Sequence, residues 1–101
     1  MSAASIRSAD GDVLHLCGEV VIASAPALLA EARKLFAGQS QIVVDLAEVS
    51  RVDSSGLALM LEWLQLAQAN NISLRFRNIP ASLLRIARLS NVEALLPLEA
   101  G

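Results

Sequence analysis

Asp53-Ser54-Ser55-Gly56 is the segment of this chain best suited to chemistry, because it combines a carboxylate, two hydroxyls and a flexible backbone position. It stands directly before an apolar stretch over 57–69, a position typical of a helix start. The first amide groups of a helix have no partner within it, and Asp or Ser side chains can bind them. One interpretation of the segment is therefore a helix N-cap.

A second interpretation of the same segment is a modification site. A hydroxyl at a helix N-terminus is an accessible phosphate acceptor, and a phosphate adds roughly −2 charge beside the positive end of the helix dipole. The residue types alone favour the N-cap, whereas the pattern around the segment favours the second interpretation, so both stay open at this point.

The remaining inventory of reactive side chains argues against an enzyme. The chain has one histidine, His15, and one cysteine, Cys17, which excludes an intramolecular disulfide, a multi-cysteine zinc site and paired-histidine metal motifs. No glycine loop that cradles phosphate is present either. We therefore expect no catalytic residue, no cofactor and no metal. His15 is expected to be a half-exposed strand residue and Cys17 a small core residue.

Charge and hydropathy restrict the class of partner. The 101 residues carry eight Lys and Arg against ten Asp and Glu, a net charge of −2, and 3% are aromatic, so a nucleic-acid partner is not expected. The longest apolar run, Leu57–Leu61, is far shorter than the roughly 20 residues of a membrane span. The first seven residues lack the pattern of a signal peptide, so a cytoplasmic location is expected.

The hydrophobic pattern predicts a single α/β domain over residues 1–101, with a mixed sheet and helices packed against it. A strand at 5–8 and a turn at Asp10-Gly11 lead into a second strand at 13–17, with Leu14 and Leu16 on one face. The later expected elements are a helix from Ser24 and Pro26 to Gly38, a buried strand over 41–46, a polar loop, a helix over 57–69, a strand over 72–76, a helix from Pro80 to Leu89 and a last apolar turn over 92–96.

The helix over 57–69 is apolar on two sides. At about 100° per residue, Leu57, Met60, Leu61 and Leu64 share the side expected to face the sheet. Leu59, Trp63 and Leu66 form the opposite side, beside Glu62. Either a neighbouring helix covers this second side or it is an exposed binding stripe. On the second alternative, a partner docks on the surface around Ser54, Ser55, Leu59, Glu62 and Trp63.

The chain resembles the STAS domain family of bacterial anti-sigma-factor antagonists. The resemblance covers nearly the whole chain and is carried by the strand ending in Asp45-Leu46, the segment Val52-Asp53-Ser54-Ser55-Gly56-Leu57 and the apolar helix that follows. Gly18-Glu19-Val20 resembles the Gly-Glu-Leu-Asp segment of that family. The resemblance implies the STAS fold and places the family's regulatory phosphorylation site at Ser54, flanked by Asp53 and Ser55.

Two branches of the family fit the chain. Residues 56–61 and 89–98 resemble the MlaB branch, the small STAS subunits of Mla ABC transporters. This implies a non-catalytic regulatory subunit on an MlaF-like cytoplasmic ATPase, held with a permease at the inner membrane, in a system that maintains outer-membrane lipid asymmetry. The alternative is an anti-sigma-factor antagonist that binds a serine kinase and is switched at Ser54. Val21 stands where that branch has an Asp, which weakens the alternative.

Overall fold

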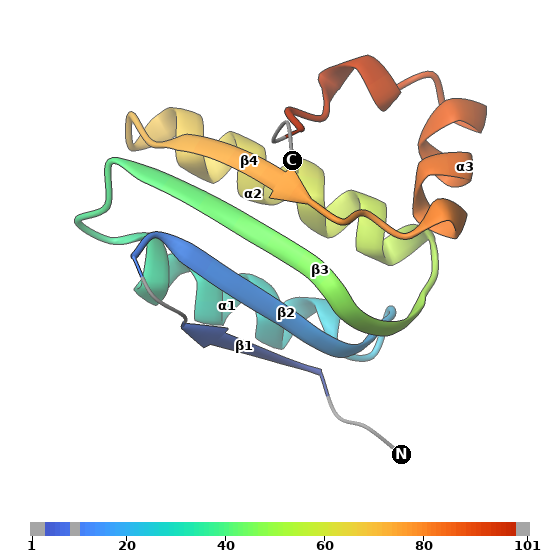
Figure 1. Cartoon of the computed structure of the whole chain (residues 1–101), viewed down its shortest axis with the longest axis horizontal. Coiled ribbons are helices and arrows are strands. Elements are labelled where there is room, and N and C mark those ends of the chain that lie inside the picture. The colour runs from blue at the N-terminus through green and yellow to red at the C-terminus, as the bar shows by residue number, and fades with distance from the viewer. Residues whose placement is uncertain (1–3, 9–10, 99–101) are drawn as a thin grey trace.

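The computed structural model describes residues 4–8 and 11–98, and its elements follow the predicted order β-β-α-β-α-β-α (Figure 1). Asp10 of the predicted turn lies outside the described residues. The elements are β1 (Ser5–Ser8), β2 (Val13–Val20), α1 (Ala25–Phe36), β3 (Gln41–Val52), α2 (Ser54–Ala69), β4 (Ser73–Arg77), α3 (Ala81–Leu89) and a final 3-10 turn, η1 (Glu93–Leu95).

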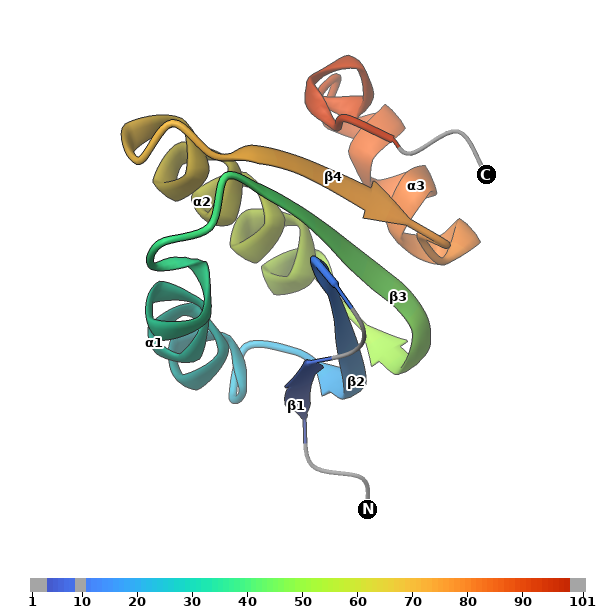
Figure 2. The same ribbon diagram turned by 60° about the vertical axis from the view of Figure 1, so that its left-hand side comes forward.

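The sheet is mixed, as predicted, with the strand order β1-β2-β3-β4. β1 pairs antiparallel with β2, whereas β2 with β3 and β3 with β4 are parallel. A parallel pair needs a crossover, and α1 and α2 supply the two crossovers against the same face of the sheet (Figures 1 and 2). The α/β architecture with a mixed sheet is therefore confirmed.

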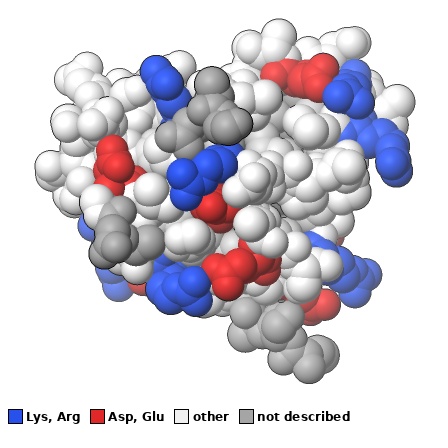
Figure 3. All heavy atoms as spheres, viewed as in Figure 1, with Lys and Arg blue, Asp and Glu red and all other residues white. Residues whose placement is uncertain are grey.

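One face of the sheet forms the core and the other is open. Leu14 and Leu16 of β2 and Leu74 and Phe76 of β4 are all buried on the helix side, as the period-2 alternation predicts. On the opposite face His15 is only half-buried, although its register partner Asp45 is 6% exposed. Figure 3 shows this open face, where positive and negative side chains lie interspersed and form no large field of one sign.

β3 corrects the sequence prediction, because residues 47–52, expected to be a polar loop, continue the strand to Val52. The pairing with β4 ends at Asp45, while the pairing with β2 runs on to Val20 and Val52 with two register shifts. The second half of β3 therefore has one neighbouring strand only and exposes polar side chains such as Glu48 and Arg51. The register shifts interrupt the alternation of buried and exposed side chains in this half of β3. Its sequence pattern therefore indicates a loop rather than a strand.

The helix boundaries follow the predicted signals, with one difference in chemistry. α1 begins after Ser24, but the Ser24 hydroxyl accepts from the Val21 N–H (3.0 Å) and donates to the Glu19 carbonyl (2.8 Å) rather than capping the helix. It therefore holds the loop between β2 and α1. Gly38 has φ +79°, the left-handed conformation expected after the end of α1.

The C-terminal part is less buried than its leucines suggest. Leu83, Ala87 and Leu96 are buried, but Leu89 is 81% and Leu95 61% exposed. Arg85 and Arg88 lie on the exposed side of α3, and Arg88 Nε donates to Glu93 Oε2 at 2.8 Å. Within the described part of the chain, no helix has the length and apolar character needed to cross a membrane.

Candidate functional site: a groove at the carboxyl ends of two strands

The parallel pairing of β2 and β3 brings two helix starts together. Val20 and Val52 are register partners at the carboxyl ends of these strands, and each strand leads into a helix within a few residues. The loop before α1 therefore lies beside the N-terminus of α2. In α/β sheets this edge is where binding sites usually form.

Asp53 joins these two segments. Its Oδ1 accepts from the Ser55 N–H at 2.8 Å, so the predicted N-cap is confirmed. Its Oδ2 accepts from the Ile22 N–H at 3.4 Å, which lies in the loop before α1. A single carboxylate thus satisfies one of the unpaired amides of α2 and also holds the neighbouring loop.

The two serines and Gly56 occupy different environments. Ser54 is exposed at the first position of α2, and Ser55 is half-buried at the second. Gly56 is buried, and a Cβ there would collide with the Val52 side chain and lie 3.4 Å from the Val20 carbonyl. The lack of a side chain at Gly56 therefore lets α2 approach the strand ends.

Trp63 corrects the predicted binding stripe. Its side chain is 1% exposed and packs against Phe36 of α1, with ring centroids 6.3 Å apart and ring planes at 54°. Leu59 is 3% exposed and Leu66 is half-buried. α1 therefore covers the second apolar side of α2, the alternative left open by the sequence, and Trp63 is a core residue rather than an interface anchor.

An apolar groove of about 350 Å³ remains between the N-terminal ends of α1 and α2. Leu59 lies at the groove with only 3% of its surface exposed, whereas Ile22, beside it, is 75% exposed. The groove is lined by Ile22, Ala25, Pro26, Leu29, Ser55, Ala58, Leu59 and Glu62. Of the predicted site residues, Ser55, Leu59 and Glu62 therefore come together here, with Ser54 exposed at the start of the same helix.

The groove continues along the two helices into a second hollow of about 190 Å³. Leu29 of α1 and Glu62 of α2 line both, so they mark the junction of the two hollows. The second hollow adds Arg33, Gln65, Leu66 and Ala69. The outer surface of the α1–α2 pair thus carries a furrow that is apolar at the Ser55 end and more polar at the other.

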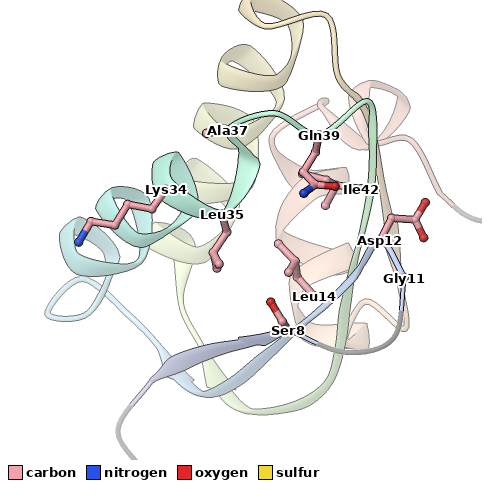
Figure 4. Close-up of a pocket in the computed structure, with 9 residues that line it drawn as sticks. All are labelled: Ser8, Gly11, Asp12, Leu14, Lys34, Leu35, Ala37, Gln39 and Ile42. Atoms are coloured by element: carbon pink, nitrogen blue, oxygen red, sulfur yellow. The ribbon is translucent and has the colours of Figure 1, made fainter.

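A different cavity, of about 220 Å³, lies near the C-terminal end of α1 and the start of β2 (Figure 4). The side chains of Leu14, Leu35 and Ile42 point toward its interior, while the charged ends of Lys34 and Asp12 point away from one another. No converging set of polar groups is present among its labelled residues. We therefore place the candidate site at the α1–α2 groove.

Asp45, on the open face of the sheet, has a structural role. Its Oδ1 accepts from the Ala47 N–H (2.9 Å) and Asn78 Nδ2 (3.1 Å), and its Oδ2 accepts from Arg77 Nε (3.1 Å). Burial raises the pKa of the Asp45 carboxyl, but the hydrogen bonds from Ala47, Asn78 and Arg77 and the charge of Arg77 outweigh it. The pKa therefore lies below its ordinary value.

Asp45→Asn is expected to lower stability at neutral pH and to flatten the loss of stability in acid. A carboxyl whose pKa is lower in the folded chain stabilises it above the unfolded pKa, and this stabilisation disappears as the pH falls toward the folded pKa. We expect a loss of about 1–3 kcal/mol at pH 7, measured by urea unfolding at pH 7 and across the acid range. Parallel pH profiles for the variant and the parent would contradict this role.

His15 lies near Asp45, and Cys17 lies two residues further along the same strand. His15 Nδ1 is 3.6 Å from Glu48 Oε2 and 3.9 Å from Asp45 Oδ2, and His15 is half-exposed on its strand, as expected. Cys17 corrects its prediction, because it is half-buried on the open face rather than in the core. Burial and the charge of Glu48 raise the pKa of its thiol, which disfavours the nucleophilic thiolate.

Comparisons with known proteins agree with this architecture. A family model described as "Mlab, STAS domain" matches residues 4–97. The anti-sigma factor antagonist SpoIIAA from Bacillus, in its unphosphorylated form, has a TM-score of 0.73 at 15% identity, covering 97% of this chain and 89% of its own. An anti-sigma factor antagonist from Mycobacterium paratuberculosis has a TM-score of 0.76 at 21% identity, covering 98% and 86%. No curated protein sequence matches significantly.

Proposed function

The chain belongs to the MlaB-type STAS domain family, and from that premise we propose that it is a non-catalytic regulatory subunit of an Mla-type ABC transporter. On this proposal it binds the cytoplasmic ATPase subunit of the transporter, which is joined to a membrane permease. Its own location is then the cytoplasmic side of the inner membrane, reached through the complex. The process it supports is phospholipid trafficking that maintains the lipid asymmetry of the outer membrane.

The observation that carries this proposal is the apolar groove beside the start of α2. Six of its eight lining residues have apolar side chains, and one of them, Ile22, is 75% exposed. An exposed apolar hollow of this kind favours protein docking over catalysis. Within the described residues, no group of three or more His, Cys, Asp or Glu side chains could hold a metal ion.

A second candidate function is that of an anti-sigma-factor antagonist that binds a serine kinase. The observation that favours it is the exposure of Ser54, which leaves this hydroxyl open to a kinase at the first position of α2. A phosphate there would lie beside the helix N-terminus, which favours negative charge. The two functions share the docking surface and differ in the partner.

The experiment that separates them is a native pull-down of the tagged protein from detergent-solubilised membranes and, in parallel, from the soluble fraction. We expect an ABC ATPase and its permease to be recovered together and identified by mass spectrometry. Recovery of a soluble serine kinase with nothing from the membrane would overturn the transporter proposal and support the second function.

Ser54→Glu is expected to leave folding intact and to weaken partner binding about tenfold or more. The added carboxylate is compatible with the helix dipole in the isolated domain, but it has to lose water when the partner covers it. Binding is measured by calorimetry with the ATPase recovered in the pull-down, and folding by circular dichroism. Ser54→Ala, which adds no charge, should bind like the parent; unfolding of Ser54→Glu would indicate a purely structural serine.

A further inference from the structure

Ile22 is a large apolar residue whose side chain is exposed to solvent. It lies 75% exposed at the groove, between the end of β2 and the start of α1. Its backbone N–H donates to Asp53 Oδ2, and the same carboxylate caps α2 through Ser55. The position of Ile22 relative to α2 is therefore set by Asp53, a residue of a different element.

The groove also carries a negative charge, the carboxylate of Glu62. Glu62 is the one charged residue among those that line the apolar groove, and Arg33 lines the second hollow together with it. No hydrogen bond or ion pair joins the Glu62 side chain to another described residue. Both oxygens of Asp53, by contrast, already accept backbone N–H groups. An exposed carboxylate beside an apolar hollow is complementary to a partner that presents apolar side chains and one cation next to them.

We propose that Asp53 is a positioning residue that presents Ile22 as an apolar anchor, and that the groove takes an amphipathic helix of the partner with a Lys or Arg facing Glu62. This inference rests on the docking surface of the proposed function and adds the kind of segment that binds there. The furrow between α1 and α2 continues through Leu29 into the second hollow, so it can hold apolar side chains spaced three or four residues apart.

The cation and the Ser54 end of the surface are separate. Glu62 comes eight positions after Ser54 on α2, which corresponds to about 12 Å along the helix. A partner cation paired with Glu62 therefore does not reach a charge placed at Ser54. For this reason Glu62 can strengthen partner binding while a carboxylate added by Ser54→Glu weakens it.

The positioning role of Asp53 can be tested without a partner, by hydrogen exchange of the Ile22 amide measured by NMR. Asp53→Asn keeps one acceptor oxygen, which can still cap α2, and replaces the other by an NH₂ group that cannot accept from Ile22. We expect about tenfold faster exchange at Ile22, with the Ser55 amide unchanged. Equal exchange at Ile22 in the variant and the parent would overturn the positioning role.

The occupant can be tested with a photo-crosslinking residue, p-benzoylphenylalanine, placed at position 22 of the full chain in cells. The control is the same residue at position 95, where the native Leu95 is also a large exposed apolar residue but lies in η1, away from the groove. We expect crosslinks above the control, to a peptide with apolar residues spaced three or four apart and a flanking Lys or Arg.

The outcomes of this crosslinking separate the inference from the proposed function. A crosslinked peptide that is acidic or lacks the helical spacing, crosslinks to lipid alone, or a yield at position 22 no higher than at position 95 would each overturn the helix occupant. The protein that contains the peptide is a separate result: a basic amphipathic helix from a protein other than an ABC ATPase keeps the inference and overturns the transporter function.

Discussion

Trp63→Ala is expected to lower the free energy of unfolding by about 3–5 kcal/mol, the largest stability effect of any single change considered for this chain. Trp63 is 1% exposed and packs against Phe36, so its removal leaves a cavity between α1 and α2. A domain of this size loses about 4–8 °C in Tm for each kcal/mol. Urea and thermal unfolding followed by circular dichroism measure the effect.

Trp63→Phe is the matched control for this change. The indole Nε1 is buried and has no hydrogen-bond partner among the described atoms, so phenylalanine removes an unsatisfied donor while it keeps a ring against Phe36. We expect a smaller loss, below about 2 kcal/mol. A Trp63→Ala variant that keeps its stability but loses partner binding would contradict the core position and return Trp63 to the interface.

The order of the helices and strands could be predicted from the sequence because apolar residues recur with the period of a strand or of a helix in each element. The alternation Leu14, Leu16 marks the buried face of β2, and the helical spacing of Leu28 and Ala32 marks the buried side of α1. Gly38 marks the end of α1 by its left-handed backbone, and Asp53 marks the start of α2 as its N-cap. These signals are short-range, so they can be recognised in a single chain.

The features that the sequence did not predict depend on contacts between distant segments. The strand over 47–52 exists because Cys17 to Val20 lie beside it, which no local pattern of β3 indicates. Trp63 is buried because α1 crosses over it, and the helical period of α2 alone left both alternatives open.

The groove was missed for the same reason. Ile22 in a short loop carries no period, and only the parallel pairing of β2 with β3 places it beside Ser55 and Ala58. The signal available in the sequence was an isolated branched apolar residue directly after a strand. Such a residue indicates a binding site only when the carboxyl ends of the two strands are known to be neighbours.

Ala58→Arg is expected to weaken partner binding about 100-fold, equivalent to about 2.7 kcal/mol. Ala58 is an exposed residue of α2 that lines the groove, so a long side chain there fills the space that the partner helix is proposed to occupy. The added cation also opposes a Lys or Arg on that helix. Because Ala58 is exposed, the change should leave the core and the unfolding free energy within about 0.5 kcal/mol of the parent.

Ala94→Arg is the matched control, since it makes the same substitution at an exposed position in η1, away from the groove. Calorimetric titration with the partner recovered in the pull-down should give parent-like affinity for Ala94→Arg and strongly reduced affinity for Ala58→Arg. Ala58→Ser, which keeps the groove open, should also bind well. Equal affinities for the two arginine variants would mean that the partner docks elsewhere, because no partner helix could share the groove with an arginine at position 58.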